Sequence, residues 1–403
     1  MGNSVVNARG PLVRVIASDS TWIEGEALRQ LDEVAKFPGM LRCVGLPDLH
    51  PGKGSPVGAA FLAEGMIYPS LVGSDIGCGM AVWATDLRAA KVRPDKLAAR
   101  LEGLDRPMDA GEVQEAELAA LGLTGEFAAS LGTPGRGNHF LEIQRVHSVE
   151  DAAAFAALGL DEGRLALLVH TGSRGLGERI LREQAARSGA QGLVAGSAEA
   201  DAYLAAHGMA IRYAELNRSV CARRMLAATG ADGAPLLDSC HNAVEEADGG
   251  WLHRKGAAPA DRGAVVIPGS RGDLTYVVAP VASPESLWSL AHGAGRKLAR
   301  HEARGKLGGR LRREDLGRNP WGGRVVCGDE LLLWEEAPGC YKDAATAVAA
   351  LVAAGLCSVI ATLAPLVTFK TSAGEGRAER RPDKESWRRD RHAGRAAKQG
   401  GWR

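Results

Sequence analysis

Residues 165–188 read LALLVHTGSRGLGERILREQAARS and contain three kinds of local structure in succession. The unbroken apolar run 165–169 predicts a buried strand, and 179–188 has the pattern of a helix. Between them lies the turn HTGSRGLG, in which glycine lets the backbone approach an anion closely while the strand fixes the position of His170. The stretch predicts a mixed α and β protein with a ligand-type side chain at the end of a strand.

The same alternation continues along the chain. Short apolar runs between glycine- and proline-rich turns predict strands at 58–62, 165–169, 264–267, 275–281 and 324–326. Helical patterns occur at 94–101, 112–121, 179–188, 200–228 and 343–354. No fixed-period repeat and no flexible linker divides the chain before about residue 371, so we expect one large α+β domain, 1–372, with a β core flanked by helices.

Composition and cysteine usage indicate a globular protein of a reducing compartment. Hydrophobic residues make up 45% of the 403 residues and charged residues 24%, and the net charge of +1 gives no global sign of affinity for a polyanion. The seven cysteines are scattered, odd in number and without a C-x-x-C pair, which argues against a disulfide framework. The first fourteen residues lack an apolar secretory segment, so we expect a cytoplasmic protein.

One stretch is long enough to cross a bilayer, because residues 344–369 contain no charged side chain. Alanine dominates its first half, Gly355 can end a helix, and 356–369 then has the pattern of a buried strand interrupted by Pro365. We therefore expect a helix followed by a strand and no contact with a membrane.

The chain changes character after Lys370. Residues 371–403 carry ten Lys or Arg and five Asp or Glu, a local charge of +5 that leaves the rest of the chain near −4. This composition predicts a basic tail at 373–403, either a solvated disordered end or an additional arm that binds RNA.

Five segments combine glycine with residues that bind metal or phosphate: PDLHPGKG at 47–54, GSDIGCG at 73–79, GRGNHFLEI at 135–143, HTGSRGLG at 170–177 and HGAGR at 292–296. Five residues are candidate metal ligands. Four come from these segments, Asp75, Cys78, His139 and His170, and His241 comes from the nearby segment CHNAVEE. Thiolate and imidazole slightly favour zinc, whereas the carboxylate leaves manganese or iron open. Each residue taken singly is equally consistent with an ordinary buried core position.

None of these segments is a P-loop or a dinucleotide-binding fingerprint, which disfavours standard GTPase or kinase chemistry. His292 lies in a turn of small residues with Arg296 close by, so it is a candidate covalent nucleophile toward phosphorus; a helix-capping histidine is the equal alternative. Asp48 is a candidate base, and a turn-capping aspartate fits it equally well.

In order and spacing, these segments resemble the RtcB family of RNA ligases from about residue 47 to Lys370. The matching motifs are D-x-x-C in GSDIGCG, G-x-G-N-H-F-x-E-I in GRGNHFLEI, H-x-G-S-R-G-x-G in HTGSRGLG, the His-Asn pair of CHNAVEE, HGAGR, and APGCYKD with the terminal Lys370. The segments WEEAPGCYKD and TLAPLVTFK are similar to the branch associated with a release-factor-H-like protein. The resemblance implies the RtcB-like fold and a GTP-dependent ligase that joins a 3′-phosphate or 2′,3′-cyclic phosphate RNA end to a 5′-hydroxyl end.

The resemblance also implies a role for each matching residue. It implies two manganese ions bridged by Cys78, with Asp75 and His139 on one ion and His170 and His241 on the other, and guanylylation of His292. The nucleotide would be bound by Asn138, Glu142, Asn242, Thr275, Gly293, Ala294, Gly295, Arg296, Tyr341 and Lys370, with Glu142, Tyr341 and Lys370 at the guanine. Thr275 lies in Asp-Leu-Thr-Tyr, where the family often has serine, so this contact departs from the family pattern.

Basic residues in or beside glycine-containing loops are candidates for contacts with the RNA backbone. They are Arg174, Arg254, Lys255, Arg271 and Arg296. The partners expected from the resemblance are the RNA ends, an archease-type activator and a release-factor-H-like protein. Two other functions remain open from the residues: a binuclear metallophosphoesterase or nuclease, and a non-catalytic protein that binds metal or RNA.

Overall fold

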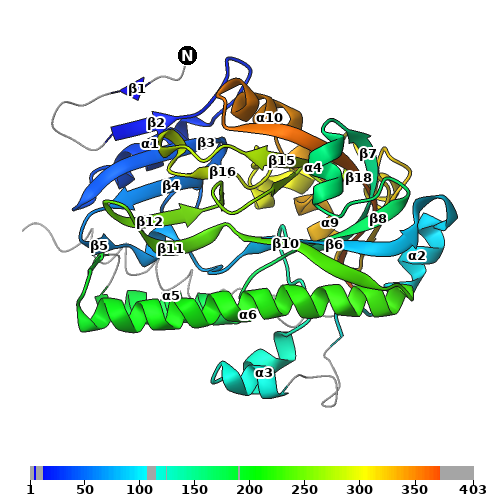
Figure 1. Cartoon of the computed structure of the whole chain (residues 1–403), viewed down its shortest axis with the longest axis horizontal. Coiled ribbons are helices and arrows are strands. Elements are labelled where there is room, and N and C mark those ends of the chain that lie inside the picture. The colour runs from blue at the N-terminus through cyan, green and yellow to red at the C-terminus, as the bar shows by residue number, and fades with distance from the viewer. Residues whose placement is uncertain (1–3, 6–11, 107–114, 124, 189–190, 373–403) are drawn as a thin grey trace, which may run out of the picture.

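The computed structural model describes residues 4–5, 12–106, 115–123, 125–188 and 191–372. Two large sheets form its core, and they lie side by side along the long axis of the molecule (Figure 1). The predicted α+β class with a β core flanked by helices is confirmed.

The first sheet has six strands. In spatial order they are β1 (Ser4–Val5), β2 (Leu12–Val15), β3 (Met40–His50), β4 (Val57–Ala63), β12 (Gly250–Lys255) and β11 (Asn242–Ala247). The pairing of β3 with β4 jumps from Gly45↔Ala59 to His50↔Val57. The stretch between, which carries Asp48, therefore departs from regular pairing and can direct a side chain out of the sheet.

The second sheet has eight strands. Its order is β10 (Gly233–Cys240), β6 (Gly79–Arg88), β8 (Arg164–Thr171), β7 (Phe140–Val149), β18 (Cys357–Thr371), β15 (Thr275–Pro280) and β14 (Val265–Pro268), with β17 (Arg324–Cys327) parallel to β18. Two small sheets pair β13 (Ala257–Pro259) with β16 (Ser289–Ala291) and β5 (Met66–Ile67) with β9 (Leu193–Val194).

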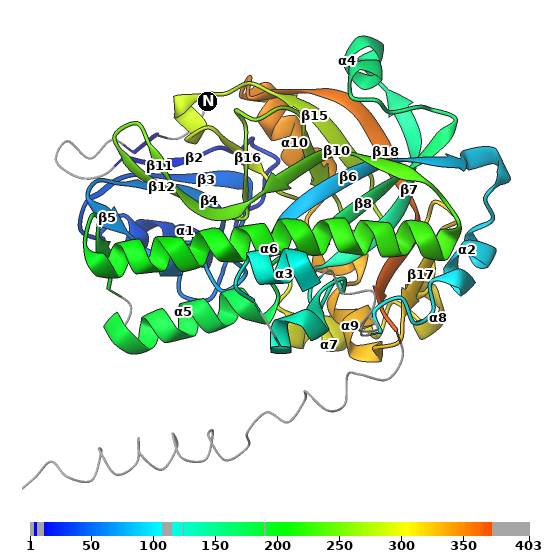
Figure 2. The same cartoon turned by 60° about the horizontal axis from the view of Figure 1, so that its bottom comes forward.

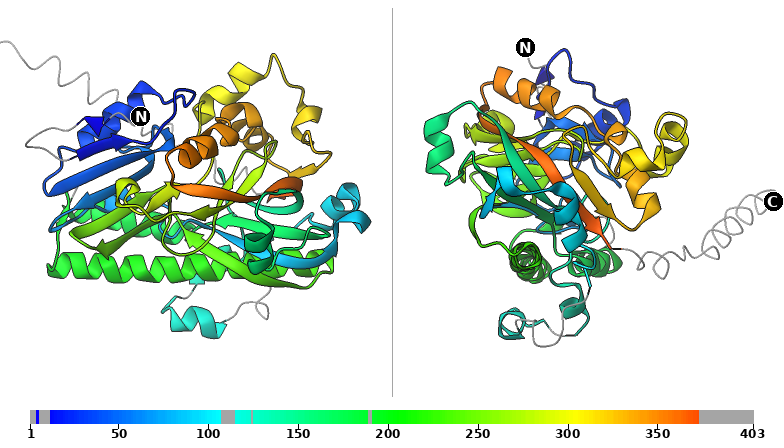
Figure 3. Two further views of the ribbon diagram at one scale, coloured as in Figure 1. Left: turned by 45° about the horizontal axis from the view of Figure 1, so that its top comes forward. Right: turned by 90° about the vertical axis from the view of Figure 1, so that its right-hand side faces the viewer.

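Helix α6 (Ala198–Thr229) runs along one face of the molecule beneath both sheets, beside α5 (Gly175–Ser188) (Figure 2). The end-on view in Figure 3 shows these two helices below the strands. Ser197 caps the start of α6, since its side chain accepts a hydrogen bond from the Ala200 amide, and Gly230 ends it in a left-handed conformation. Tyr213, Asn217, Arg218 and further residues of α6 are buried, so this helix is a wall of the core.

The remaining α-helices are shorter. They are α1 (Gly25–Val34), α2 (Pro94–Arg100), α3 (Glu115–Ala120), α4 (Ala152–Ala157), α7 (Ala303–Leu307), α8 (Arg313–Leu316), α9 (Glu330–Glu335) and α10 (Ala344–Ala353). Helix α10 packs against β3, β14 and β18 on the other side of the sheets from α6 (Figure 1). Each strand and helix predicted above has its counterpart here, although residues 112–114 of the expected helix 112–121 and the tail 373–403 lie outside the described residues.

The uncharged stretch 344–369 forms a helix and then a strand, as expected, with one correction. Pro365 does not interrupt β18, because the strand continues to Thr371 with only a shift in its pairing with β7 between Pro365 and Val367. Proline removes one ladder hydrogen bond, and this irregularity accommodates the loss. No helix in the described part of the chain combines the length and the apolar character that crossing a membrane requires. All seven cysteines are free.

Candidate active site

The candidate metal ligands come together because the second sheet is antiparallel at its centre. Cys78 immediately precedes β6, His170 lies at the end of β8, and His139 immediately precedes β7. Since neighbouring strands run in opposite directions, the start of one lies beside the end of the next. His241 follows β10, whose last residue pairs with Gly79, at the point where the chain passes into the first sheet. One edge of the sheet therefore collects all four side chains.

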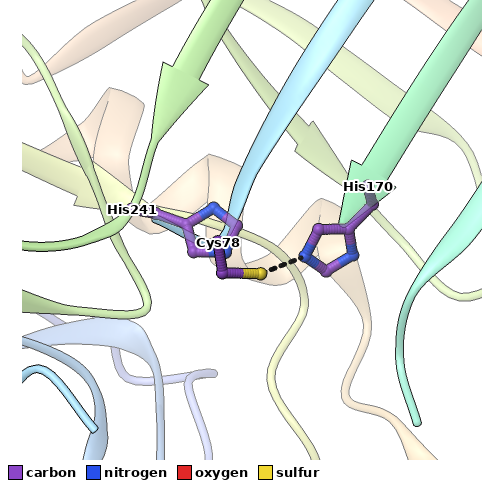
Figure 4. Close-up of side chains that lie close together, drawn as sticks. All are labelled: Cys78, His170 and His241. Atoms are coloured by element: carbon purple, nitrogen blue, oxygen red, sulfur yellow. Dashed lines mark hydrogen bonds between the residues drawn. The ribbon is translucent and has the colours of Figure 1, made fainter. Parts of the chain in front are cut away.

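Two triads of ligand atoms share Cys78. The first consists of Cys78, His170 and His241 (Figure 4), and the second of Asp75, Cys78 and His139; within each, the ligand atoms lie within 4.8 Å of one another. The Cys78 Sγ lies 3.3 Å from His170 Nε2 and 3.4 Å from His139 Nε2, which in turn lies 2.7 Å from an Asp75 oxygen. Carboxylate, thiolate and imidazole in this arrangement form a donor set for a pair of transition-metal ions. We call these five residues the metal end of the site.

The backbone fixes which nitrogen of His139 faces the other ligands. The Nδ1 atom of His139 lies 2.9 Å from the Pro134 carbonyl oxygen, which can only accept a hydrogen bond, so Nδ1 carries the proton. The lone pair is then on Nε2, which faces Asp75 and Cys78. A histidine held by a carbonyl in this way is the usual arrangement of a metal ligand in proteins.

Burial controls the protonation of the metal end. It lowers the pKa of His170 and of His241 well below the usual range, so both imidazoles are neutral at pH 7, the form that binds a metal. Burial and the neighbouring Asp75 raise the pKa of the Cys78 thiol. Burial also acts to raise the pKa of Asp75, but His139, Cys78 and Arg174 together act against it and the net change is downward. A cation at the triads would favour the thiolate form of Cys78.

His292 follows β16 and is oriented by Asp48. Its Nδ1 lies 2.7 Å from Asp48 Oδ2, and its backbone amide donates to the same oxygen at 3.3 Å. Asp48 is fully buried, which makes this carboxylate a rigid support for the ring. With Nδ1 donating to the carboxylate, Nε2 keeps its lone pair and is available as a nucleophile.

Two glycines make room for this pair. Gly256 has a φ of +64°, and a Cβ placed on it would lie 2.8 Å from His292 Cε1. Gly295 has a φ of +75°, and a Cβ there would lie 2.2 Å from the Asp48 carbonyl oxygen. Both the backbone conformation and the close approach therefore exclude larger residues.

The four histidines form a row of rings. The centroid distances are 5.2 Å from His139 to His170, 5.2 Å from His170 to His241 and 4.8 Å from His241 to His292. The nucleophile-type histidine is therefore the direct neighbour of the first triad. A phosphate bound by metal at the triads would lie within reach of His292.

A cavity of about 450 Å³ extends from the metal end along His292 to a second cluster of charged residues. The predicted site residues that line it are Asp75, Cys78, Asn138, Glu142, His170, His241, Asn242, Arg271, His292, Ala294, Gly295, Arg296, Tyr341 and Lys370. Asp48 and His139 are buried and contact residues of this wall, and Thr275 is buried and pairs with Pro268 of the wall. The volume is in the range of small-molecule sites in proteins.

Sequence reasoning missed a buried carboxylate, Glu336, in the second cluster. One of its oxygens accepts from Arg296 Nη1 at 3.0 Å and the other accepts from the Tyr341 hydroxyl, while Lys370 Nζ lies 3.8 Å away. Burial acts to raise the pKa of Glu336, but Lys370 and Arg296 bring it below its usual value. Arg300, also missed, lies 3.5 Å from the same carboxylate. The signal available was the position of Glu336 in the quoted segment WEEAPGCYKD.

Glu142 is the second buried carboxylate of this cluster. It lies on β7, opposite Thr368 of the neighbouring strand β18. It accepts hydrogen bonds from the Thr368 hydroxyl and from Gln144 Nε2 at 2.6 Å, and Gln144 Nε2 also donates to the Thr275 hydroxyl. Burial raises the pKa of Glu142 to about 7. Burial also lowers the pKa of Lys370, whose Nζ donates to the Gly137 carbonyl, to about 8. We call Glu142, Glu336, Tyr341 and Lys370 the carboxylate end of the site.

The other predicted residues lie in different surroundings. The Asn242 amide donates to the Asp75 carbonyl at 3.1 Å and its oxygen accepts from the Gly256 amide. Gly293 lies beside His292 and is not among the lining residues. The Arg271 guanidinium is buried and donates to the Glu336 and Leu333 carbonyls.

Three predicted basic residues are not part of the cavity wall. Arg174 bonds to Thr133, Arg254 is buried and bonded to Glu245, and Lys255 is bonded to Ser55. Their predicted contact with RNA stays a prediction, and the structure pairs Arg254 with the half-buried Glu245 and Lys255 with the buried Ser55.

The fold and the cavity place a candidate cysteine–histidine metal site directly beside His292. A family model described as "tRNA-splicing ligase RtcB" matches residues 30–125 and 102–371. The chain is 47% identical over 367 residues to the RNA-splicing ligase RtcB2 of Escherichia coli, covering 90% of this chain and 97% of that one. It is also 32% identical to the RNA-splicing ligase RtcB of Mycobacterium tuberculosis over 85% of this chain and all of that one.

The same chain is 30% identical to the tRNA-splicing ligase RtcB of Archaeoglobus fulgidus, covering 86% of this chain and 92% of that one. The chain belongs to the RtcB family, and it is an RNA ligase.

Proposed function

We propose that the protein is a GTP- and manganese-dependent ligase that joins RNA 3′-phosphate or 2′,3′-cyclic phosphate ends to 5′-hydroxyl ends through a guanylylated His292. One observation carries the proposal. His292 is held through Nδ1 by the buried Asp48 and lies directly beside His241 of the first triad, in one cavity with the carboxylate end.

The metal end fits a pair of ions. Its facing atoms are sulphur, imidazole nitrogens and carboxylate oxygens, which are the donor types that bind transition-metal ions, and a bound cation would replace their contacts with one another. Cys78 belongs to both triads and would bridge the two ions, with Asp75 and His139 on one side and His170 and His241 on the other. When bound, two manganese ions would neutralise charge on phosphate oxygens and stabilise the attacking and leaving groups of a displacement.

His292 performs the first step. Its Nε2 attacks the α-phosphorus of GTP, a phosphorus–nitrogen bond forms, the bond to the β-phosphate oxygen breaks, and pyrophosphate leaves. Asp48 stabilises the positive charge that develops on the imidazole, because its carboxylate lies 2.7 Å from Nδ1. The GMP then passes to the RNA 3′-phosphate, and attack by the 5′-hydroxyl releases it. A cyclic phosphate is opened to the 3′-phosphate before this sequence starts.

The carboxylate end would recognise the base. The ionised Glu142 can accept hydrogen bonds from the N–H edge of guanine, and Tyr341 and Lys370 flank it. Asn138, Asn242 and the segment Gly293 to Arg296 would face the phosphates. Thr275 acts through Gln144, which bonds to both Thr275 and Glu142.

The partners and location follow from the same proposal. The RNA backbone would approach over Lys53 and Arg300, basic residues of the cavity wall. From the resemblance we also propose an archease-type activator and a functional link to a release-factor-H-like protein. Seven free cysteines support a reducing compartment, and we propose the cytoplasm.

The test is covalent labelling. Wild-type protein incubated with α-³²P-GTP and Mn²⁺ should acquire an acid-labile label that moves to an RNA 3′-phosphate end and is lost on ligation. The His292→Ala variant should show no label yet bind nearly as much manganese, because His292 belongs to neither triad.

The competing functions give different results. A binuclear phosphoesterase or nuclease would hydrolyse the RNA end without GTP, and a non-catalytic binding protein would bind metal and RNA without turnover. Label that persisted in His292→Ala would remove the histidine from its role.

A further inference from the structure

We propose that two adjacent residues of α6 position the two triads separately: Asn217 holds the Asp75–Cys78–His139 triad and Arg218 holds the Cys78–His170–His241 triad. Neither residue lies near enough to be a ligand, so each would act on the metal ions through the segments that carry the ligands. The inference rests on the metal pair of the proposed function.

Arg218 joins the three segments of the first triad. Its side chain is fully buried, and its Nη1 donates to the carbonyl of Gly77, next to Cys78, at 2.7 Å and to that of Thr171, next to His170, at 3.0 Å. Its Nε donates to both oxygens of Asp238 on β10, the strand that leads to His241. The charged guanidinium thus connects the backbone beside Cys78 and His170 with the strand that leads to His241.

Asn217 joins the segments of the second triad. It is fully buried, its oxygen accepts from the Gly132 amide at 2.7 Å, and its nitrogen donates to the Thr133 carbonyl at 3.2 Å. The next residue, Pro134, supplies the carbonyl that holds His139 Nδ1. Asn217 thereby fixes the loop that sets the orientation of His139.

Asn217 also reaches the strand end that supports Asp75. Its nitrogen lies 3.3 Å from the Gly172 carbonyl oxygen and 3.2 Å from the Thr171 hydroxyl, which itself donates to the Pro134 carbonyl. Gly172 packs so tightly on Asp75 that a Cβ would lie 2.1 Å from the carboxylate. Asn217 on α6 therefore fixes Gly172, and the packing of Gly172 in turn fixes the carboxylate of Asp75.

The charge of Arg218 is paired with Asp238, whose Oδ1 lies 2.7 Å from Nη2. A fully buried arginine is costly unless it is paired, and its pairing here is directed at ligand-bearing segments. Outer contacts of this kind typically change metal affinity by about 10- to 100-fold.

The experiment measures manganese binding to the full-length protein by titration calorimetry and follows the exchange-coupled metal pair by electron paramagnetic resonance. The variants are Asn217→Asp and Arg218→Lys. The first keeps the side-chain oxygen that accepts a hydrogen bond and loses the N–H donors, and the second keeps the positive charge and loses the planar guanidinium with its several N–H donors. Each should weaken one of two binding events by roughly 10- to 100-fold and the other by clearly less, because the two triads share Cys78.

Two backgrounds identify which event is affected. In His241→Ala the triad of Asp75, Cys78 and His139 remains, so Asn217→Asp should weaken the remaining site strongly and Arg218→Lys should weaken it less, through its contact beside the shared Cys78 alone. In His139→Ala the triad of Cys78, His170 and His241 remains. There Arg218→Lys should weaken the remaining site more than Asn217→Asp does. Tyr213→Phe is the matched control: it lies on the same buried face of α6 and loses a hydrogen bond to the Phe127 carbonyl, which flanks no ligand.

Milder substitutions cover the case in which a variant does not fold, as judged by thermal unfolding in EDTA. Asn217→Ser and Asp238→Asn loosen the same contacts without adding buried charge on α6. Equal weakening of both sites by both variants, or the same effect from Tyr213→Phe, would overturn the separate roles. Wild-type protein that bound fewer than two ions would contradict the proposed function itself, and is thereby distinguished from a failure of this inference.

Discussion

The metal end and the carboxylate end lie in one cavity, and they differ in what stabilises their charged and polar groups. At the metal end, ligand atoms that mainly accept converge on Cys78, and their arrangement is completed by a cation. At the carboxylate end, Glu336 has Arg296, Tyr341 and Lys370 as partners, and its charges balance within the protein. A metal ion would therefore replace short contacts among the ligands themselves, whereas a nucleotide at the carboxylate end must displace charged groups that are paired within the protein.

The largest effect is expected from removal of the residue that both triads share. In Cys78→Ser the hydroxyl is a poor anionic bridge, so both ions should be lost and RNA ligation should fall roughly 10³-fold or more. Metal content by mass spectrometry and ligation of a 3′-phosphate RNA end measure the two effects. Cys43→Ser, at a buried thiol outside the triads, is the control. Full metal and activity in Cys78→Ser would make Cys78 an ordinary core residue and end the comparison.

The carboxylate end should respond differently to loss of its central residue. Glu336→Gln leaves Lys370 and the partly buried Arg296 without their counter-charge, so unfolding should cost about 3 kcal/mol less than in the wild type. GTP binding should weaken about tenfold, because the donors that face the nucleotide lose their orientation. Calorimetry with GTP and thermal unfolding test this, while the manganese content should be unchanged.

The control is Glu335→Gln, because this substitution removes the same charge from the neighbouring residue, which is less buried. Loss of manganese in Glu336→Gln would show that the two ends are coupled, which contradicts the contrast drawn between them.

The sequence singled out all the residues that meet at the metal end, but only some of those that meet at the carboxylate end. Asp75, Cys78 and His139 each lie in a short glycine-containing segment, so local pattern was enough to find them. Glu336 has its role through Arg296 and Arg300 of one distant segment and Lys370 of another, and no local pattern marks which of two adjacent glutamates, 335 or 336, is buried. The sequence did not predict the strand pairing either, and only the order of β6, β8, β7 and β18 places Lys370 beside Glu142 and brings both into one cavity with the metal end.

The pH dependence of base recognition gives a smaller effect. Burial raises the pKa of Glu142 to about 7, so its carboxyl is protonated below that pH and ionised above it. Only the ionised form accepts two hydrogen bonds from guanine, so the preference for GTP over ATP should rise as pH increases from 6 to 8, by about tenfold at most. The ratio of the two affinities cancels the pH dependence of metal binding, which is common to both nucleotides.

The Glu142 carboxyl also makes the stability of the fold depend on pH, and this dependence has the opposite sign to that of the GTP preference. Because the folded chain binds this proton more tightly than the unfolded chain, the contribution of Glu142 to folding should increase as pH falls from about 7 to 4.5. Glu142→Gln should flatten both profiles. A GTP preference with the same pH dependence in that variant would assign guanine recognition to another residue.

The smallest effect is expected from removal of the basic tail. The described chain ends two residues after Lys370, and this end is anchored by Asp105, which accepts from the Thr371 hydroxyl and the Ser372 amide, and by the Gly103 amide, which donates to Ser372 Oγ. A protein that ends at Ser372 keeps these contacts. Manganese content and GTP labelling should therefore match the full-length protein.

Only RNA binding should change in that truncation, because residues 373–403 carry a charge of +5 and two tryptophans, Trp387 and Trp402, that can stack on bases. Affinity should fall a few-fold at low salt, and the logarithm of affinity should depend less steeply on the logarithm of salt concentration, since fewer counterions are released. A full-length variant with the ten tail Lys and Arg residues changed to Gln separates charge from stacking. Unchanged affinity across the titration would assign RNA binding to the cavity and its rim alone, and lost labelling would show that the carboxylate end depends on the chain beyond Ser372.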